Sequence, residues 1–245
     1  MFNPRPQLVS DEIYHISSRA VGDTVIFDSE DDFYRGIFCI YEFNTGTPVE
    51  ILKKRLARNR FKTRQKATKL GGRRTSAQLQ PDGRDRLVDI LAFSFMPNHL
   101  HLILRQIKDN GISNFMKKVN GGYAKYFNEK YKRKGHLFSK FYPVHIKDNN
   151  QLKSGFVYVH TNLISLVEPG WKEKGIENPE KVIEFLENNK RHSYPDYLGK
   201  KAFPSVTERD FLLEAMGGEE GCRAEVGVWV KYKKELRDLS AKFSK

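Results

Sequence analysis

Cysteine is scarce in this sequence of 245 residues, which contains only Cys39 and Cys222. The two cysteines lie far apart and form no Cys-x-x-Cys pattern. The sequence therefore indicates neither a disulfide framework nor a zinc site built on thiolates.

Long apolar runs are also missing. No stretch of about 18 apolar residues is present, and Met1 to Ser10 lacks the basic-then-apolar layout of a signal peptide. We therefore expect a cytoplasmic protein that makes no membrane contact and that associates with the nucleoid if it binds DNA.

Several reaction classes lack their sequence signatures here. The chain contains no Gly-x-x-x-x-Gly-Lys phosphate loop, no Gly-x-Ser-x-Gly elbow, no dinucleotide-binding Gly-x-Gly-x-x-Gly and no His-Glu-x-x-His helix. Nucleotide-driven, serine-hydrolase and zinc-protease chemistry are thus set aside.

Acidic residues are fewer than basic ones, and most of the imbalance lies in one segment of the sequence. The formal net charge is +13, and the block from Lys53 to Arg86 contains thirteen basic residues against only Asp82 and Asp85. Such a block predicts an extended arm or loop, for which a phosphate backbone is the favoured partner. Its alternative interpretation is a solvated loop without a partner. The arginines of this block that we expect to contact such a backbone are Arg58, Arg60, Arg73 and Arg74.

Two histidines stand out in the largely apolar stretch from Ala92 to Leu104. Side chains alternate between the faces of a strand, so His99 and His101 would share one face while the leucines between and after them occupy the other. Two adjacent imidazoles can bind one divalent cation, although paired structural histidines are an alternative. Pro97-Asn98 predicts a turn just before them.

The second informative stretch runs from Asn149 to Val167. Its apolar residues recur at helical spacing and predict an amphipathic helix with one buried stripe, formed by Leu152, Phe156, Val159, Leu163 and Leu166. At 3.6 residues per turn, Tyr158 and Asn162 lie about 40° apart on a flank of that stripe. A tyrosine placed there is not simply part of the core.

The order of the remaining elements predicts an α+β fold. Strands alternate with helices in a pattern that one antiparallel sheet, with helices on one face, would satisfy. The predicted strands are Glu12–Ser18, Leu87–Phe95, His99–Arg105 and Leu137–Ile146, and the predicted helices include Asp31–Phe43, Ser113–Lys130 and Gly221–Ala241.

Five sequence blocks, in order, resemble the single-tyrosine HUH transposases, especially their REP-associated branch. The resemblance covers about residues 10 to 200. The blocks are Tyr14-His15-Ile16-Ser17-Ser18-Arg19, Met96-Pro97-Asn98-His99-Leu100-His101, Gly135-His136-Leu137-Phe138, Tyr158-Val159-His160-Thr161-Asn162 and Ser193-Tyr194-Pro195-Asp196-Tyr197-Leu198-Gly199.

The resemblance implies a ferredoxin-like fold and a specific division of roles. His99 and His101 match the paired histidines that hold Mg²⁺ or Mn²⁺, Tyr158 matches the nucleophile, and Asn162 matches a third metal ligand. The family cleaves and rejoins hairpin-containing single-stranded DNA through a 5′-phosphotyrosine intermediate. Because the bond energy is kept in that link, no nucleotide cofactor is implied.

Other residues receive less specific expectations. The residues that we expect to contact DNA outside the basic block are Arg19, Lys117, Lys118, Lys125 and His136. The other histidines, His15, His145, His160 and His192, are expected to be structural or exposed. Tyr123 and Tyr126 are alternative nucleophiles that helical spacing assigns to the core.

Some alternatives stay open at this point. The chain could bind hairpin DNA without cutting it, as an inactive or domesticated relative, or could bind RNA on its sheet. Monomer and homodimer are both compatible with the sequence. We divide the chain into a transposase domain over residues 1–200, which contains the basic insertion 53–86, and a helical extension over residues 201–245.

Overall fold

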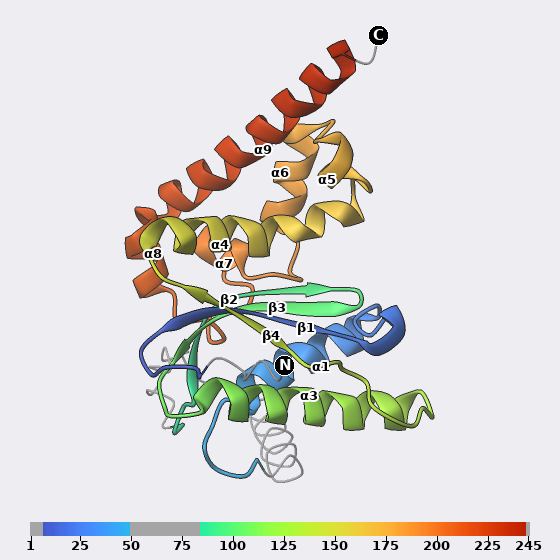
Figure 1. Cartoon of the computed structure of the whole chain (residues 1–245), viewed down its shortest axis with the longest axis vertical. Helices are drawn as coiled ribbons and strands as arrows, with labels where there is room; N and C mark the ends of the chain where they lie inside the picture. The colour runs from blue at the N-terminus through green and yellow to red at the C-terminus, as the bar shows by residue number, and fades with distance from the viewer. Residues whose placement is uncertain (1–6, 50–83, 244–245) are drawn as a thin grey trace, which may run out of the picture.

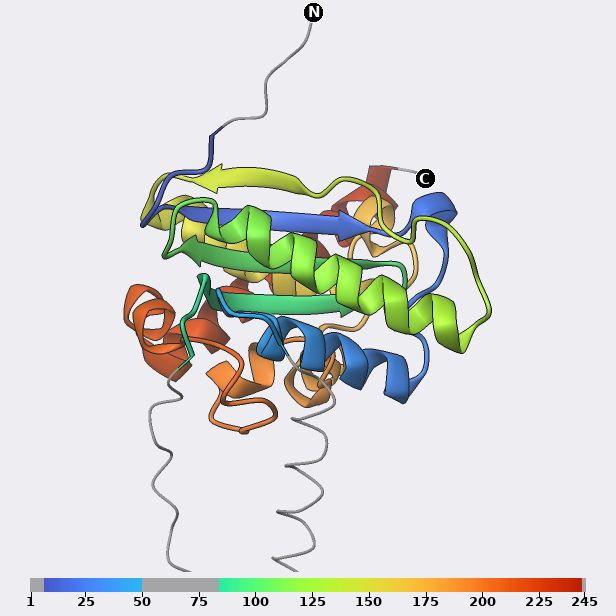
Figure 2. The ribbon, with the colours of Figure 1, turned by 90° about the horizontal axis from the view of Figure 1, so that it is seen from below.

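The computed structural model describes residues 7–49 and 84–243, and its centre is one antiparallel sheet. The four strands lie side by side in the order β2-β3-β1-β4 (Figure 2). Their bounds are Ile13–Arg19 for β1, Val88–Met96 for β2, His99–Gln106 for β3 and Tyr142–Ile146 for β4. Arg58, Arg60, Arg73 and Arg74 lie outside the described residues. In the described part of the chain, no helix has the length and apolar character needed to span a bilayer.

Helices cover both faces of this sheet, and not one face as the sequence predicted. Helices α1 (Glu30–Glu42) and α3 (Gly111–Lys130) lie on one side, and α4 (Asn149–Thr161) lies on the other (Figure 1). The reason is visible in β2, where all nine residues are buried. A strand that carries apolar side chains at consecutive positions needs cover on both faces.

The layer formed by α1 and α3 is joined by a buried carboxylate. Ser29 caps α1 by accepting a hydrogen bond from the Asp32 amide. The carboxylate of Asp32 accepts hydrogen bonds from Tyr126 and Lys130 of α3 and from Tyr131, which follows the last residue of that helix. These bonds offset the cost of burying the charge and fix the two helices against each other.

The predicted hairpin is confirmed. β2 and β3 pair from Val88 and Gln106 to Met96 and His99 around the turn at Pro97-Asn98. The predicted last strand is shorter than expected. Phe138 makes only an isolated bridge with Ala20, beyond the end of β1, and its neighbour Leu137 packs in the core on the α1 and α3 side.

The predicted helix from Asn149 to Val167 is divided. α4 ends at Thr161, and a 3₁₀ helix, η2, continues over Asn162–Leu166. The tighter 3₁₀ turn changes the angular phase of the side chains. Leu166 is therefore exposed, whereas the earlier members of the predicted stripe, from Leu152 to Leu163, are buried.

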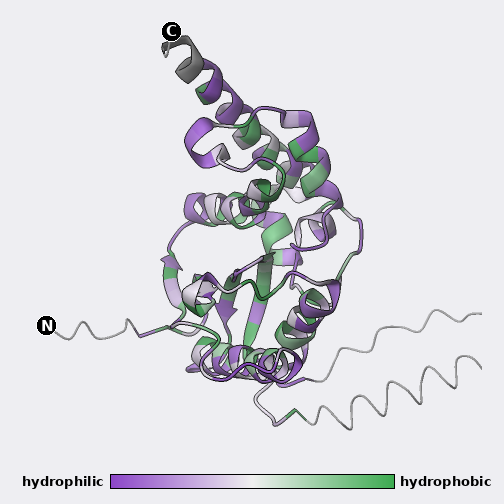
Figure 3. Ribbon diagram, turned by 90° about the vertical axis from the view of Figure 1, so that its right-hand side faces the viewer, coloured by the Kyte–Doolittle hydropathy of each residue, from purple (hydrophilic) through white to green (hydrophobic). Residues whose placement is uncertain are grey.

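The C-terminal helices form a further layer outside α4. They are α5 (Trp171–Lys174), α6 (Pro179–Asn188), α7 (Tyr194–Tyr197), α8 (Asp210–Met216) and α9 (Gly218–Phe243). α9 begins three residues earlier than predicted and crosses over α4 (Figure 1). Figure 3 shows hydrophobic residues gathered where the strands and helices meet. The extension shares the core of α4, because Met216, Cys222, Val226 and Val230 pack with Phe156.

The last two basic residues of the Lys53–Arg86 block belong to this folded body. Arg84 lies over the Tyr41 ring and donates to the Tyr41 carbonyl oxygen. Arg86 forms ion pairs with Asp89 and Glu208. The predicted arm is thus anchored at its C-terminal end.

Candidate active site

His99 and His101 lie side by side on the sheet face that α4 covers. β3 sends Leu100, Leu102 and Leu104 into the core on the opposite face, as the alternation of side chains predicted. The two imidazole ring centroids are 4.7 Å apart. The turn before them is held in place because Ala20 donates to the Asn98 carbonyl oxygen.

Each of these imidazoles has a hydrogen-bond partner on its Nδ1 atom. His99 Nδ1 lies 2.6 Å from Asn98 Oδ1, and the Asn98 amide nitrogen donates to Asp23. The oxygen of Asn98 therefore faces His99, which must donate from Nδ1 and leave its Nε2 lone pair free. His101 Nδ1 lies 2.9 Å from His15 Nε2.

Burial keeps this cluster uncharged at neutral pH. Burial lowers the pKa of His15 and His99 to about 4 in each case, and the positive charges of Arg19 and Lys172 lower that of His99 further. His101 is only 4% exposed, and burial next to His99 and His15 lowers its pKa to about 2. Neutral imidazoles of this kind can donate a lone pair to a cation.

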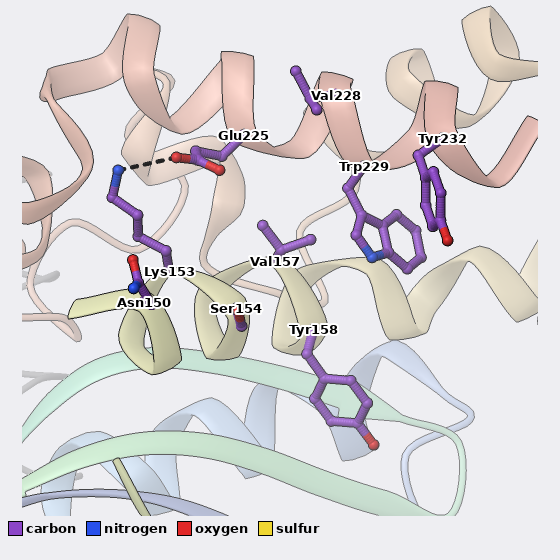
Figure 4. A pocket seen from close by; sticks show the side chains of 9 residues that line it. All are labelled: Asn150, Lys153, Ser154, Val157, Tyr158, Glu225, Val228, Trp229 and Tyr232. Atoms are coloured by element: carbon purple, nitrogen blue, oxygen red, sulfur yellow. Dashed lines mark hydrogen bonds and ion pairs between the residues drawn. The ribbon is translucent and has the colours of Figure 1, made fainter. Parts of the chain in front are cut away.

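Tyr158 projects from α4 toward the histidines and remains accessible. The residue is 45% exposed, and its ring meets two imidazoles edge-on, with centroids 5.6 Å from His101 and 5.4 Å from His15. The view in Figure 4 shows the phenol pointing from the helix toward the sheet. An exposed hydroxyl beside neutral imidazoles can reach a substrate bound there.

The position of α4 is fixed by a buried polar contact close to this tyrosine. His160 Nε2 lies 2.8 Å from Ser193 Oγ, and the same oxygen accepts the amide of Phe93 in β2. Phe156, one turn before His160, packs in the surrounding core. Helix and sheet are therefore tied together two residues from Tyr158.

Asn162 lies one turn beyond Tyr158 and is 3% exposed. Its amide nitrogen donates to the Tyr158 carbonyl oxygen at 2.8 Å, which leaves its side-chain oxygen as the atom suited to a cation. Among residues 7–49 and 84–243, no three His, Cys, Asp or Glu side chains are grouped so that they could hold a metal ion. The nitrogen donors that fit such an ion are those of His99 and His101.

The residues predicted to contact DNA lie in separate parts of the structure. Arg19 lies at the end of β1, beside His99 in the strand pairing, and forms an ion pair with Asp23. Lys117, Lys118 and Lys125 project from α3, on the sheet face away from Tyr158.

A groove on that face, with a volume of about 710 Å³, is lined by these three lysines together with Phe43 and Gly122. Lys118 also donates to the carbonyl oxygens of Thr45 and Thr47, so part of its hydrogen-bonding capacity is used within the fold. His136 is exposed on the segment that follows α3.

Of the alternative nucleophiles, Tyr123 is a core residue and Tyr126 is partly buried against the same core. Tyr123 is buried and donates to the carbonyl oxygen of Ile26. Tyr126 donates to Asp32. Both lie on α3, on the sheet face opposite Tyr158.

Sequence reasoning missed two members of this site. His15 was assigned a structural or exposed role, yet it contacts both His101 and Tyr158. Lys172 was not singled out, although it is close enough to lower the pKa of both His99 and His101. His15 stood in a quoted block at the predicted first strand, but only the pairing of β1 with β3 reveals its partner.

Fold and site together define a class of protein. In this class, a sheet carries a His-hydrophobic-His pair beneath a helix that presents a tyrosine. Residues 56–162 match the model of the family described as Transposase IS200 like. This region of the chain, which includes His99, His101 and Tyr158, is therefore similar to the IS200-like transposase family. The resemblance stated from the sequence is confirmed.

Two solved structures are similar to the chain at low identity. One is titled "Structure of the REP associates tyrosine transposase bound to a REP hairpin", with a TM-score of 0.45, 11% identity, and coverage of 86% of this chain and 93% of that chain. Another is titled "Bacterial tRNA(HIS) Guanylyltransferase (Thg1)-Like Protein in complex with ATP", with a TM-score of 0.38, 9% identity, and coverage of 75% and 72%. At these scores neither likeness carries weight in assigning a role. No curated protein matches the sequence.

Proposed function

We propose that this protein is a metal-dependent endonuclease and strand transferase that acts on hairpin-containing single-stranded DNA, with Tyr158 as its nucleophile. The observation that carries the proposal is the position of the exposed Tyr158 ring, edge-on to the buried neutral imidazole of His101. The family of residues 56–162 and the basic composition support the same assignment.

The reaction is a phosphoryl transfer in two directions. The Tyr158 oxygen attacks the scissile phosphorus, the bond from phosphorus to the 3′ oxygen breaks, and a 5′-phosphotyrosine link forms. The phenolic proton leaves to solvent, and the released 3′ oxygen takes up a proton. Attack by a 3′-hydroxyl on the phosphotyrosine reverses these steps and rejoins DNA, so no nucleotide is consumed.

A divalent ion, Mg²⁺ or Mn²⁺, held by His99, His101 and Asn162, would supply Lewis-acid stabilisation of charge on the phosphate. The chain prepares its ligands before any ion binds. Asn98 fixes the ring of His99 with its Nε2 atom free, and burial keeps both imidazoles neutral. Such outer hydrogen bonds orient metal-binding histidines and raise their basicity.

We place the nucleophile and the histidines of this site within one chain. Tyr158 lies beside His101 and His15 of the same molecule, so a partner subunit is not needed to supply the nucleophile. This arrangement supports cleavage in cis, whether the protein is a monomer or a homodimer.

The test is the formation of a covalent protein–DNA adduct. Labelled hairpin oligonucleotides with single-stranded flanks are incubated with the full chain and Mg²⁺ or Mn²⁺, and the products are separated on a denaturing gel. We expect a protein-linked strand with the wild type and none with Tyr158→Phe. Tyr142→Phe is the matched control, because Tyr142 is an exposed tyrosine on β4.

The outcomes separate the alternatives. An adduct that persists in Tyr158→Phe would overturn the assignment of the nucleophile. Hairpin binding without an adduct in any protein would favour the non-cutting binder. An RNA hairpin of the same sequence serves as competitor and tests the choice between DNA and RNA.

A further inference from the structure

A groove runs between α4 and α9 and opens at Tyr158. Its volume is about 650 Å³, and its lining includes Lys153, Val157 and Tyr158 from α4 and Glu225, Trp229 and Tyr232 from α9 (Figure 4). The C-terminal extension thus forms one wall of a depression whose other wall carries the proposed nucleophile.

The α9 wall exposes aromatic and apolar side chains side by side. Trp229 and Tyr232 are three residues apart and therefore lie on the same side of the helix. Tyr232 is 53% exposed and the neighbouring Val228 is 67% exposed. Trp229 is half-buried, with its ring held edge-on against the buried Trp171 at 5.2 Å between centroids. Rings held in this way can stack on another flat ring without first becoming ordered.

Positive charge accompanies these rings. Lys233 Nζ lies 5.6 Å from the centroid of Trp229 and 5.9 Å from that of Tyr232. The one acidic residue in the groove lining, Glu225, is paired with Lys153 at 3.0 Å. The groove therefore has aromatic rings on its α9 wall, a lysine, Lys233, beside those rings, and a lining carboxylate that is already paired.

Lys172 connects the groove to the histidines. Its Nζ lies 5.8 Å from the ring centroid of Trp171, which packs against Trp229. The charge of Lys172 also acts on His99 and His101. Lys172 therefore brings positive charge close to both the histidines and the tryptophan pair.

We propose that this groove binds the unpaired DNA strand next to the cut site, with bases stacked on Trp229 and Tyr232 and phosphates near Lys172 and Lys233. The proposal rests on the function proposed above, which requires a single strand at Tyr158. Aromatic rings interleaved with lysines are the usual means of binding single-stranded nucleic acid, because every base offers a π face. Duplex bases are already stacked on each other, so the groove selects an unpaired strand over a hairpin stem.

The first experiment measures binding without cleavage. A fluorescently labelled oligothymidylate is titrated with the full chain in EDTA, and affinity is followed by anisotropy. Loss of one stacking base costs about 1–3 kcal/mol, so Tyr232→Ala should weaken binding about fivefold or more. Tyr232→Phe should bind like the wild type. Tyr34→Ala is the matched control, because Tyr34 is a comparably exposed tyrosine on α1, on the other face of the sheet.

The second experiment tests whether the groove binds the single-stranded tail or the hairpin stem. The same proteins are titrated with one hairpin that carries a single-stranded tail and with the same hairpin lacking it. Tyr232→Ala should lose affinity for the tailed hairpin only. Lys233→Gln should lower the dependence of oligothymidylate affinity on salt by about one unit of slope or less, as expected for one lost phosphate contact.

Unchanged affinity for both the oligothymidylate and the tailed hairpin in a folded Tyr232→Ala protein would overturn the proposal, and circular dichroism checks the fold. Failure of the proposed function is a separate result. In that case no adduct forms with the wild type, while the groove variants still lose affinity in EDTA.

Discussion

His15 Nε2 and His101 Nδ1 lie 2.9 Å apart, across the pairing of β1 with β3. His101 is opposite Ser17 in the strand register, so His15 is its diagonal neighbour on the same face. If His101 donates from Nδ1 to His15, its Nε2 lone pair is free, as it is in His99. His15 would then select the form of His101 that binds a cation.

The first prediction follows from this contact. His15→Ala removes the acceptor on His101 Nδ1, and the loss of such an outer-shell partner typically costs about 10–100-fold in metal affinity. We expect Mn²⁺ binding, measured by calorimetry on the DNA-free protein, to weaken by about tenfold or more. His145→Ala is the control. His145 lies on the outer strand β4, and its imidazole is paired with Glu12 and not with His101. Equal Mn²⁺ affinity in wild type and His15→Ala would show that His15 does not orient His101.

A second prediction concerns cleavage in cis. His99→Ala should abolish metal-dependent cleavage while hairpin binding largely persists, and Tyr158→Phe should form no adduct. Because Tyr158 lies beside the histidines of its own chain, mixing the two variants should restore no activity. Cleavage is measured on a gel over a range of mixing ratios. Recovery in the mixture would mean that the tyrosine is supplied by a partner subunit.

The third prediction addresses the attachment of α4 to the sheet. Ser193→Ala removes the hydroxyl that contacts His160 at 2.8 Å and accepts the Phe93 amide. Leaving buried polar groups without partners costs about 1–3 kcal/mol, so the free energy of unfolding in urea should fall by that amount. Ser139→Ala, at an exposed position, should change stability by far less. If Ser193→Ala unfolds at the same urea concentration as the wild type, this contact does not contribute to the free energy of unfolding.

The fourth prediction concerns pH. His192 is fully buried, donates from Nε2 to the Leu186 carbonyl oxygen, and burial lowers its pKa from 6.5 to about 4. Between these two values the unfolded chain binds a proton that the native protein does not. Lowering the pH from about 6.5 to 4 therefore favours unfolding, by at most about 1.4 kcal/mol per pH unit for this residue.

The measurement compares urea unfolding at pH 7 and pH 5. The loss of stability on acidification should be smaller in His192→Gln than in the wild type, since glutamine can still donate to Leu186 and does not titrate. His136→Gln, at an exposed position, should retain the full loss. An identical loss in His192→Gln and the wild type would contradict this account.

The sequence by itself determined the parts of this protein that depend on local periodicity. Alternation around the Pro97-Asn98 turn predicted the hairpin with His99 and His101 on one face, and helical spacing placed Tyr158 on a flank of its helix. Each of these two patterns lies within about twenty residues of chain, so each can be recognised without knowledge of the fold. The charge excess likewise predicted a polyanionic partner.

Only the tertiary structure decided how distant segments meet. His15 joins His101 across 86 positions of sequence, and Trp229 of α9 comes to line a groove with Tyr158 of α4. Strand register and helix packing set these contacts, and neither is encoded in a local pattern. The covering of both sheet faces was decided in the same way, because the apolar surface of β2 is satisfied only by helices far along the chain.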